Sequence, residues 1–366
     1  MFRTIGIAVF TTILTSKSRP ISSIAIKPIM KAVQITEYKS YEEQDLTPIE
    51  VSKPECTPGM VLIKSVAASI NPIDINFMPG VIDWVKPNPF TPGYDISGVV
   101  ESVGEGVEDV KVGDAVFACN WGSNKESHLN FHSDENDSCI GGAFAEYVLL
   151  PANKVSKKPE SISHAEAAAV SLVGLTAFQC IEKLLGEYKE GAYLGKRILV
   201  LGGSGAVGYI ACQVAKLGGA TVYTTCSSRT KDYVEKGTNA DHLINYRDEN
   251  WESVEALKDV DAVLDTTGEE NAFSKAKIVL NTNGKFATIA SFDVGFDPNG
   301  HPPLSFASFM TLRNDVNHQA LLADLLVCKK LNLSIEETFS FSKDGVTKAF
   351  AKQASGKSMG KNVILF

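Results

Sequence analysis

A glycine-rich turn between an apolar run and a helical pattern sets the tightest limit on how this chain folds. The turn, Gly-Ser-Gly-Ala-Val-Gly, occupies residues 203–208, directly after the run RILVLG, and it overlaps the start of the helical segment AVGYIACQVAKLG. In that setting Gly203 permits a tight turn, Gly205 lets a ligand approach the backbone, and Gly208 lets helix and strand pack closely. The pattern predicts a strand–turn–helix unit whose helix N-terminus is open to an anion.

The spacing of these glycines predicts a dinucleotide site, because free N–H groups and the helix dipole favour a pyrophosphate. We expect its residues to be Gly203, Ser204, Gly205, Ala206, Val207 and Gly208. An NAD site would carry Asp or Glu about 20 residues further on. This chain has Ser227, Ser228, Arg229 and Lys231 there, and no acid. Hydroxyl and basic groups suit a 2′-phosphate and favour NADPH, although a solvated helix start would also explain the two basic residues.

Strand and helix patterns alternate around this turn. A long apolar helix is expected over residues 163–185, with Ser163 as its N-cap and Glu166 completing a capping box. The runs RILVLGG, ATVYTTC, DAVLDTTG and GKFATIAS are continuously apolar and are separated by helical segments. Such runs predict a parallel sheet covered by helices on both faces. We assign residues 156–301 to a doubly wound parallel sheet of the Rossmann type, which makes the fold class α/β.

The residues on either side of this domain have other patterns. Residues 30–155 contain short alternating apolar runs with turn residues between them, which predict an antiparallel β domain. Residues 302–366 return to a helix and a final strand-like NVILF, and we expect this segment to pack back on the β domain.

Composition narrows the class of protein and its surroundings. The net charge of −8 and the pI near 5.4 argue against nucleic acid as a main partner. The seven scattered cysteines form no secreted framework, so we expect an intracellular protein. Residues 1–29 are basic, hydroxyl-rich and free of acid, and their apolar run is too short to span a bilayer. They are typical of a transit peptide to a mitochondrion or other organelle; a secretory signal or an upstream extension before Met30 of a cytoplasmic protein also fits.

Five strings together resemble one enzyme family. FTPGYDISGVVESVG and LVLGGSGAVG resemble the medium-chain dehydrogenase/reductases, and SINPIDI (69–75), GGAFAEYV (141–148) and AAAVSLVGLTAF (167–178) resemble their quinone oxidoreductase branch. The resemblance runs from about Met30 to Phe366. It implies a GroES-like β domain that binds substrate, a Rossmann domain that binds NADPH, and a tail that rejoins the β domain. Homodimers or homotetramers are common in the family, and no membrane span is implied.

The zinc ligands of the family are missing from this sequence. Where zinc-dependent members have a Cys, a His-Glu pair and a later Cys, this chain has Asn71-Pro72, Tyr94-Asp95 and Leu172. One carboxylate does not hold zinc, so we expect no metal there. Residue types that bind zinc do occur elsewhere, in a polar insertion and its flanks, but their spacing fits no established motif: Cys119, His128, His132 and Cys139.

Chemistry without zinc points to hydride transfer from NADPH to an electron-poor acceptor, either a quinone or an α,β-unsaturated carbonyl compound. By resemblance, Asn71 orients the acceptor oxygen through its amide. Tyr94 stands at a zinc-ligand position and is either a proton donor or a residue that lines the site. The resemblance also places Tyr246 beside Arg229, Thr176 near the nicotinamide, Thr267 and Gly268 at the nicotinamide ribose, and Ala290 at the nicotinamide edge.

Two other functions stay open from the sequence. An enoyl-thioester reductase of the same superfamily would need a basic patch for coenzyme A phosphates, and the sequence shows no obvious one. A non-catalytic NADPH-binding protein is the other alternative, because no catalytic acid is unambiguous.

Overall fold

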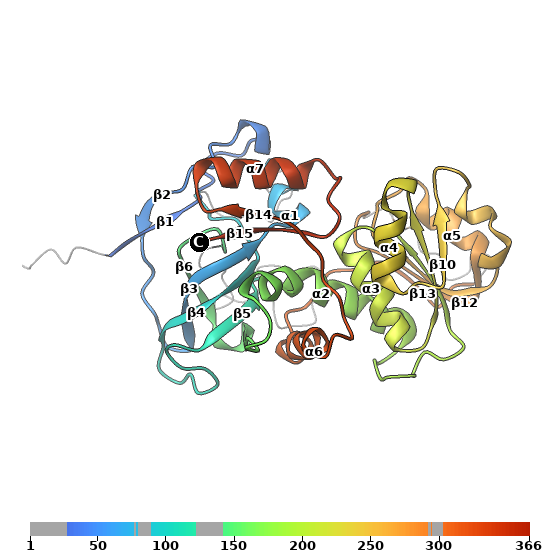
Figure 1. The fold of residues 1–366 in the computed structure, drawn as a ribbon, viewed down its shortest axis with the longest axis horizontal. Coiled ribbons are helices and arrows are strands. Elements are labelled where there is room, and N and C mark those ends of the chain that lie inside the picture. The colour runs from blue at the N-terminus through green and yellow to red at the C-terminus, as the bar shows by residue number, and fades with distance from the viewer. Residues whose placement is uncertain (1–27, 77, 80–88, 122–141, 292–293, 295–302) are drawn as a thin grey trace, which may run out of the picture.

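The computed structural model describes residues 28–76, 78–79, 89–121, 142–291, 294 and 303–366. Figure 1 shows two parts that each contain a β-sheet, with the long helix α2 (His164–Leu185) between them. Most of the expected leader lies outside the described residues, and so do His128, His132 and Cys139 of the polar insertion.

The first part is built on a mainly antiparallel sheet, in the order β14-β15-β3-β4-β5-β7, with β6 pairing β3. Its strands are β3 (Met60–Ser69), β4 (Asp95–Val103), β5 (Ala115–Cys119), β6 (Tyr147–Pro151), β7 (Val155–Lys157), β14 (Ile335–Ser340) and β15 (Lys361–Leu365). A separate antiparallel pair is formed by β1 (Ile29–Ala32) and β2 (Ile49–Ser52). Its helices are α1 (Pro72–Asn76), which follows β3, and α7 (Lys343–Ala354), which packs against β14 and β15.

The C-terminal segment returns to this first sheet. β15 pairs antiparallel with β3, with Val363 opposite Ser69 and Leu365 opposite Ala67. This register carries Lys361, the first residue of β15, past the end of β3 to the start of α1. The final strand is therefore placed to contribute a side chain to whatever lies at that edge.

The second part is a six-stranded parallel sheet in the order β10-β9-β8-β11-β12-β13. Its strands are β8 (Arg197–Leu201), β9 (Thr221–Cys226), β10 (His242–Asn245), β11 (Val260–Asp265), β12 (Leu280–Thr288) and β13 (Phe306–Phe309). Its helices are α3 (Ala206–Leu217), α4 (Lys231–Thr238) and α5 (Ala272–Val279).

Both parts also contain short 3-10 helices. These are η1 (Tyr41–Glu43), η2 (Ala152–Lys154), η3 (Ser228–Thr230), η4 (Trp251–Ser253) and η5 (Glu255–Leu257). The expected α/β fold, a GroES-like β domain with a Rossmann-type parallel sheet, is confirmed.

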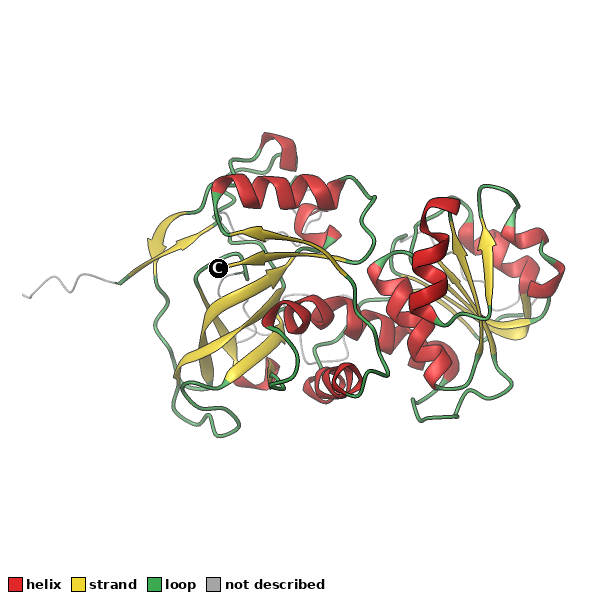
Figure 2. Ribbon diagram, viewed as in Figure 1, coloured by secondary structure: helices red, strands yellow, loops and turns green. Residues whose placement is uncertain are grey.

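Helices cover both faces of the parallel sheet, which explains why its strands are continuously apolar. Ile198 and Val200 of β8 lie in one buried cluster with α2 and α3. Leu199 and Leu201 alternate with them and lie in a second cluster with α5. Figure 2 shows the helices on either side of this sheet.

The parallel sheet continues past the boundary that we expected at residue 301. β13 pairs in parallel with β12, with Phe306 opposite Lys285 and Phe309 opposite Thr288. The strand is only four residues long and lies at the edge of the sheet, so its apolar pattern is too short to stand out in the sequence.

Helix α2 joins the two parts. Its N-cap is Ser163, and the predicted capping box with Glu166 is present. It packs against β3 and β4 of the first sheet and against β11 of the second. In the part of the chain that the structure describes, α2 alone is long and apolar enough to cross a membrane, and 78% of its apolar window is buried in the protein. That burial is typical of a core helix. The remaining helix, α6 (Val316–Val327), packs on α2 and β7.

Candidate active site

The carboxyl ends of the parallel strands meet at one edge of the second sheet. β8 and β11 are neighbours, and the strand order runs in opposite directions from this pair, which is where open α/β sheets bind ligands. The glycine turn follows β8, and Gly205 is the N-cap of α3. The N-terminus of α3 therefore faces this edge with free N–H groups.

The three glycines of the turn have different surroundings. A Cβ on Gly203 would lie 2.3 Å from Oγ1 of Thr224, and one on Gly208 would lie 2.3 Å from the carbonyl oxygen of Gly202. A Cβ on Gly205 would meet only the Gly202 carbonyl oxygen, at 3.5 Å. The outer side of Gly205 is thus open, as close approach of a pyrophosphate requires.

The left-handed residue of this turn is the glycine just before the motif. Gly202 has a φ of 89°, whereas Gly203 does not lie in the left-handed region. Gly203 is needed instead because the buried Thr224 leaves no room for a side chain. Its N–H donates to the carbonyl oxygen of Thr225 over 3.0 Å, which ties the turn to the neighbouring strand β9.

The residues expected at a 2′-phosphate lie after the ends of β9 and β10. Ser227 is buried, while Ser228, Arg229 and Lys231 are exposed around η3. The exposed Tyr246 follows β10, and its N–H donates to the carbonyl oxygen of Cys226 over 3.2 Å. Tyr246 therefore lies beside the end of β9, in the region of the Ser227–Lys231 group.

Two contacts of the residues after β9 were not predicted from the sequence. Asn245 Nδ2 donates to Ser228 Oγ over 2.8 Å, which holds the loop of residues 227–231 against the end of β10. A guanidinium nitrogen of Arg229 donates to the carbonyl oxygen of Lys357 over 3.3 Å, a residue of the segment that leads into β15. These contacts leave other N–H groups of Arg229 able to bind an anion.

Three of the four residues expected at the nicotinamide end lie close together after β11 and β12. A Cβ on Gly268 would lie 3.2 Å from both Cβ and the carbonyl oxygen of Ala290. Thr267 is anchored by Asp265, whose Oδ1 accepts from its N–H at 2.8 Å and from its hydroxyl at 2.7 Å. Asp265 also accepts from Gly268 and Thr288, so this buried carboxylate organises both loops.

The two expected catalytic residues lie in the first part, near α2. Asn71 is fully buried between β3 and α1. Tyr94 is buried just before β4, and its ring makes an edge-to-face contact with Trp121, with centroids 4.9 Å apart. Thr176 is on α2, where its hydroxyl donates to the carbonyl oxygen of Leu172 over 2.8 Å.

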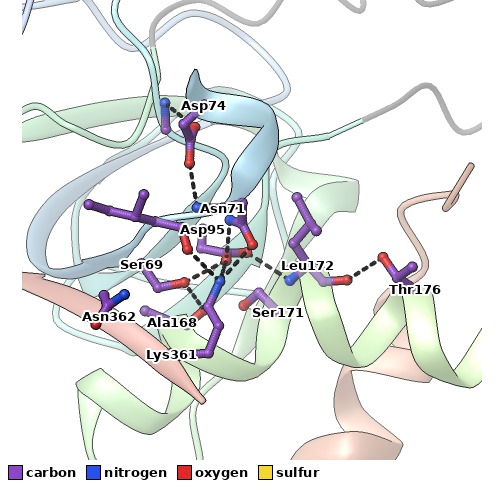
Figure 3. Close-up of polar contacts among 12 residues, drawn as sticks. Ser69, Asn71, Asp74, Asp95, Ala168, Ser171, Leu172, Thr176, Lys361 and Asn362 are labelled. Atoms are coloured by element: carbon purple, nitrogen blue, oxygen red, sulfur yellow. Dashed lines mark hydrogen bonds and ion pairs between the residues drawn. The ribbon is translucent and has the colours of Figure 1, made fainter. Parts of the chain in front are cut away.

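Asn71 belongs to a buried polar cluster (Figure 3). Its Nδ2 donates to Oδ2 of Asp95 over 2.8 Å, and its Oδ1 accepts from Nζ of Lys361 over 2.6 Å. The same Nζ donates to the carbonyl oxygen of Ile70 over 2.8 Å and lies 3.5 Å from Asp95 Oδ2. Ser69 also donates to Asp95 Oδ2. The cluster therefore draws on β3, β4 and β15.

The Asp95 carboxyl also binds α2, because the backbone N–H of Leu172 donates to its Oδ1 over 2.7 Å. All these groups donate to Asp95, as suits a carboxylate. Burial raises the pKa of Asp95, and the neighbouring Lys361 and these donors oppose that rise. Burial lowers the pKa of Lys361, and the carboxylates of Asp95 and Asp74 oppose that change. Two buried opposite charges thus stabilise one another.

Asp74 is the second buried carboxyl near Asn71. Its Oδ2 accepts from the backbone N–H of Asn71 at 2.8 Å, and its Oδ1 accepts from that of Gly93 at 3.0 Å. Burial raises the pKa of Asp74 to about 7, and nearby Asp95 adds to the rise. Asp74 thus fixes the backbone on which Asn71 sits.

The donor set at the former zinc positions does not fit a zinc ion. Asn71 provides an amide, Asp95 a carboxylate and Leu172 an aliphatic side chain. The ammonium of Lys361 contacts both the amide and the carboxylate. Among the residues that the structure describes, no three His, Cys, Asp or Glu side chains are grouped to hold a metal ion. Cys119 is buried on β5.

Sequence reasoning missed Lys361 and Asp265. Lys361 begins an apolar strand, and such a lysine is usually read as facing solvent. Asp265 ends β11 directly after the apolar residues 262–264, and that position at a strand end was a usable signal.

Both parts of the chain match known protein families. Residues 57–160 match the family model "Alcohol dehydrogenase GroES-like domain", and residues 238–364 match "Zinc-binding dehydrogenase". The 2-methylene-furan-3-one reductase of Solanum lycopersicum is 33% identical over 345 residues, which cover 94% of this chain and 81% of that protein. The mitochondrial NAD(P)H oxidoreductase RTN4IP1 of Bos taurus is 31% identical, with 84% and 82% covered. The solved quinone oxidoreductase from Coxiella burnetii matches with a TM-score of 0.77 and 26% identity, over 93% of this chain and 100% of that one.

Proposed function

This chain belongs to the medium-chain dehydrogenase/reductase family, and from that premise we propose that it is an NADPH-dependent reductase of quinones or α,β-unsaturated carbonyl compounds that works without zinc. The observation that carries the proposal is the cluster of Asn71, Asp95 and Lys361. It puts an amide and an internal cation where zinc-dependent members bind their metal. An acceptor reduced here must be electron-poor already, since no metal polarises it.

The preference for NADPH over NADH rests on the loop after β9. Ser227, Ser228 and Arg229 offer hydroxyl and guanidinium donors, and the strand ends in Cys226 where an NAD site would have an acid. A guanidinium binds a phosphate with strong, paired hydrogen bonds. An acidic side chain at the same place would repel the 2′-phosphate.

In the proposed mechanism, NADPH supplies the hydride when it is bound. The glycine turn would hold the pyrophosphate on the N-terminus of α3, and the loops organised by Asp265 would border the nicotinamide end. The Asn71 amide carries two N–H groups, of which one is bonded to Asp95. We assign the other to the acceptor oxygen, where negative charge accumulates as the hydride adds to the conjugated carbon.

Tyr94 completes the reaction in this proposal. Its phenol would give a proton to the acceptor after the hydride has been added, and the resulting phenolate would regain a proton from solvent before the next turnover. Its ring is held against Trp121, and its backbone leads directly into Asp95. The hydroxyl is thereby carried by a packed, buried side chain rather than by an exposed one.

The acceptor class is supported by the relatives. One is named for reducing a methylene-furanone, whose name describes a carbon–carbon double bond beside a ketone, and a solved neighbour is named a quinone oxidoreductase. Both acceptors place the incoming negative charge on oxygen. Tyr94 directly precedes Asp95 and pairs with Trp121, and an aromatic pair of this kind offers an apolar surface that suits such ring compounds.

The test is NADPH oxidation by the purified protein, followed by absorbance, with benzoquinones, an ortho-quinone, alkenals, alkenones and an enoyl-CoA as acceptors. We expect turnover with quinones or enones that prefers NADPH to NADH and is unchanged by a chelator. Preference for the enoyl-CoA would identify an enoyl-thioester reductase instead. Tight NADPH binding without turnover on any acceptor would identify a binding protein.

A further inference from the structure

We propose that Lys361 is a positioning residue that fixes which way the Asn71 amide faces, and so aims its second N–H at the acceptor oxygen. This inference rests on the proposed function. Lys361 would act through Asn71 and not on the acceptor itself. The C-terminal strand β15 would thereby complete a site otherwise built by β3, β4 and α2.

Every donor of the lysine has a partner in the cluster. Nζ lies 2.8 Å from the Ile70 carbonyl oxygen, 2.6 Å from Asn71 Oδ1 and 3.5 Å from Asp95 Oδ2. An ammonium carries three N–H groups, so this set uses all of them. Lys361 is 2% exposed and Asp95 is 0% exposed, which removes competition from water. The lysine is therefore held in one place.

The orientation of the amide is determined from two sides. In the present orientation Oδ1 faces the Lys361 ammonium and Nδ2 faces the Asp95 carboxylate. Rotation by half a turn would set the NH₂ against the ammonium and the oxygen against the carboxylate, and both contacts would repel. The two contacts, drawn in Figure 3, therefore hold the amide in one orientation, and with it the direction of the second N–H, the one that is not bonded to Asp95.

Lys361 also preserves the partner on the other side of the amide. Without its positive charge Asp95 would be a buried, uncompensated carboxylate, and such groups take up a proton. In the part of the chain that the structure describes, the other ionisable groups beside Asp95 are Asp74 of α1 and Cys119, its neighbour on β5, and neither supplies a positive charge. A protonated Asp95 donates as well as accepts, so it no longer dictates the direction of the amide.

The test compares three variants in the NADPH oxidation assay. Lys361→Met should lower kcat by about tenfold or more, as loss of an oriented donor does, with KM for NADPH within about twofold of wild type. Asn71→Ala combined with Lys361→Met should be no slower than Asn71→Ala alone, because Lys361 acts through that amide. Multiplied losses in this double variant would overturn the proposal.

Stability is separated from orientation by a charge-neutral variant. Lys361→Met combined with Asp95→Asn removes both buried charges, so it should fold even where the single variant does not. We expect its melting temperature to recover toward wild type while kcat stays low, because an Asn at residue 95 does not dictate the Asn71 orientation. Recovery of kcat together with stability would mean that Lys361 serves the fold alone.

A measurement without turnover distinguishes failure of this inference from failure of the proposed function. In protein labelled with ¹⁵N-asparagine, the Asn71 side-chain NH₂ signals are assigned by their loss in Asn71→Asp. They should shift in Lys361→Met and stay in place in Lys64→Met, a control at an exposed lysine of β3. If wild type reduces no acceptor but the signals shift, the function is wrong and the orientation stands. If they do not shift, the orientation is wrong whatever the activity.

Discussion

The Nζ of Lys361 lies 2.6 Å from Oδ1 of Asn71, although 290 positions of the chain separate the two residues. The contact exists because β15 pairs with β3, which brings the end of the chain to the start of α1. A strand that closes the first sheet thus also supplies the cation of its polar cluster. Fold and site are linked here, so experiments on the site need controls for stability.

The guanidinium of Arg229 gives the sharpest test of cofactor choice. Arg229→Ala should raise the KM for NADPH by roughly tenfold to a hundredfold and change that for NADH little, because a hydrogen bond to a charged group contributes about 1.5–3 kcal/mol. Steady-state kinetics with both cofactors measures this. Lys236→Ala, at an exposed lysine further along α4, is the matched control. Equal changes for NADPH and NADH would remove Arg229 from the 2′-phosphate site.

Substitution of two glycines of the turn should have different effects, one on NADPH affinity and the other on stability. Gly205→Ala meets no close neighbour and has a φ of −76°, so the protein should fold normally. Its methyl group would stand where the pyrophosphate approaches, and the Kd for NADPH should rise by about tenfold or more, equal to the loss of about one good hydrogen bond. Fluorescence titration with NADPH measures the affinity. Unchanged affinity would place the pyrophosphate elsewhere.

Gly208→Ala is the counterpart to this variant. Its Cβ would lie 2.3 Å from the Gly202 carbonyl oxygen, which is backbone and cannot swing away. The free energy of unfolding should fall by about 1–3 kcal/mol, as for other overpacked sites. Urea denaturation of both variants measures the difference. Equal stability of the two would mean that α3 and β8 tolerate a wider separation.

Much of the fold follows from local patterns. Continuous apolar strands, helical segments between them and the spacing of three glycines predict a parallel sheet with its dinucleotide turn, since each signal is contained in a few neighbouring residues. The role of Gly203 was harder to foresee. It depends on Thr224 of the adjacent strand, and no local pattern shows that the side chain is there.

The polar cluster could not be predicted in the same way. Asn71 was identified by resemblance and Asp95 was noted only as a lone carboxylate at a zinc position, while their partner Lys361 begins a strand near the end of the chain. Burial of a lysine depends on a carboxylate that meets it only after the sheet has formed. A charged residue in an apolar strand therefore reads as solvent-facing until the strand order is known.

Asp74 should make stability depend on pH. Burial raises its pKa from 3.8 to about 7, so the folded chain holds a proton there that the unfolded chain has released. Stability should therefore fall as the pH rises between about 4 and 7, by at most about 1.4 kcal/mol per pH unit, and level off above pH 7. Urea denaturation at pH 5, 6, 7 and 8 follows the change.

Asp74→Asn removes this titration and should make the fall with pH smaller, although Asp95, whose pKa burial also raises, still contributes. Its amide oxygen still accepts one of the two backbone N–H groups, from Asn71 or Gly93. Asp109→Asn, at an exposed aspartate, should leave the profile as in wild type. A wild-type profile that is as flat as that of Asp74→Asn would mean that Asp74 is ionised throughout this pH range.

Tyr94 is either a proton donor or a residue that only packs in the site, and two substitutions distinguish these roles. Tyr94→Phe keeps the ring and its edge-to-face contact with Trp121 but removes the hydroxyl. If the phenol gives the proton, kcat should fall by about a hundredfold, since general acids contribute on that scale. Tyr94→Leu removes the ring as well and should also weaken acceptor binding. Full turnover in Tyr94→Phe together with a raised acceptor KM in Tyr94→Leu would assign Tyr94 to packing. The proton would then have to come from another donor, because the chemistry at Asn71 provides only a hydrogen bond.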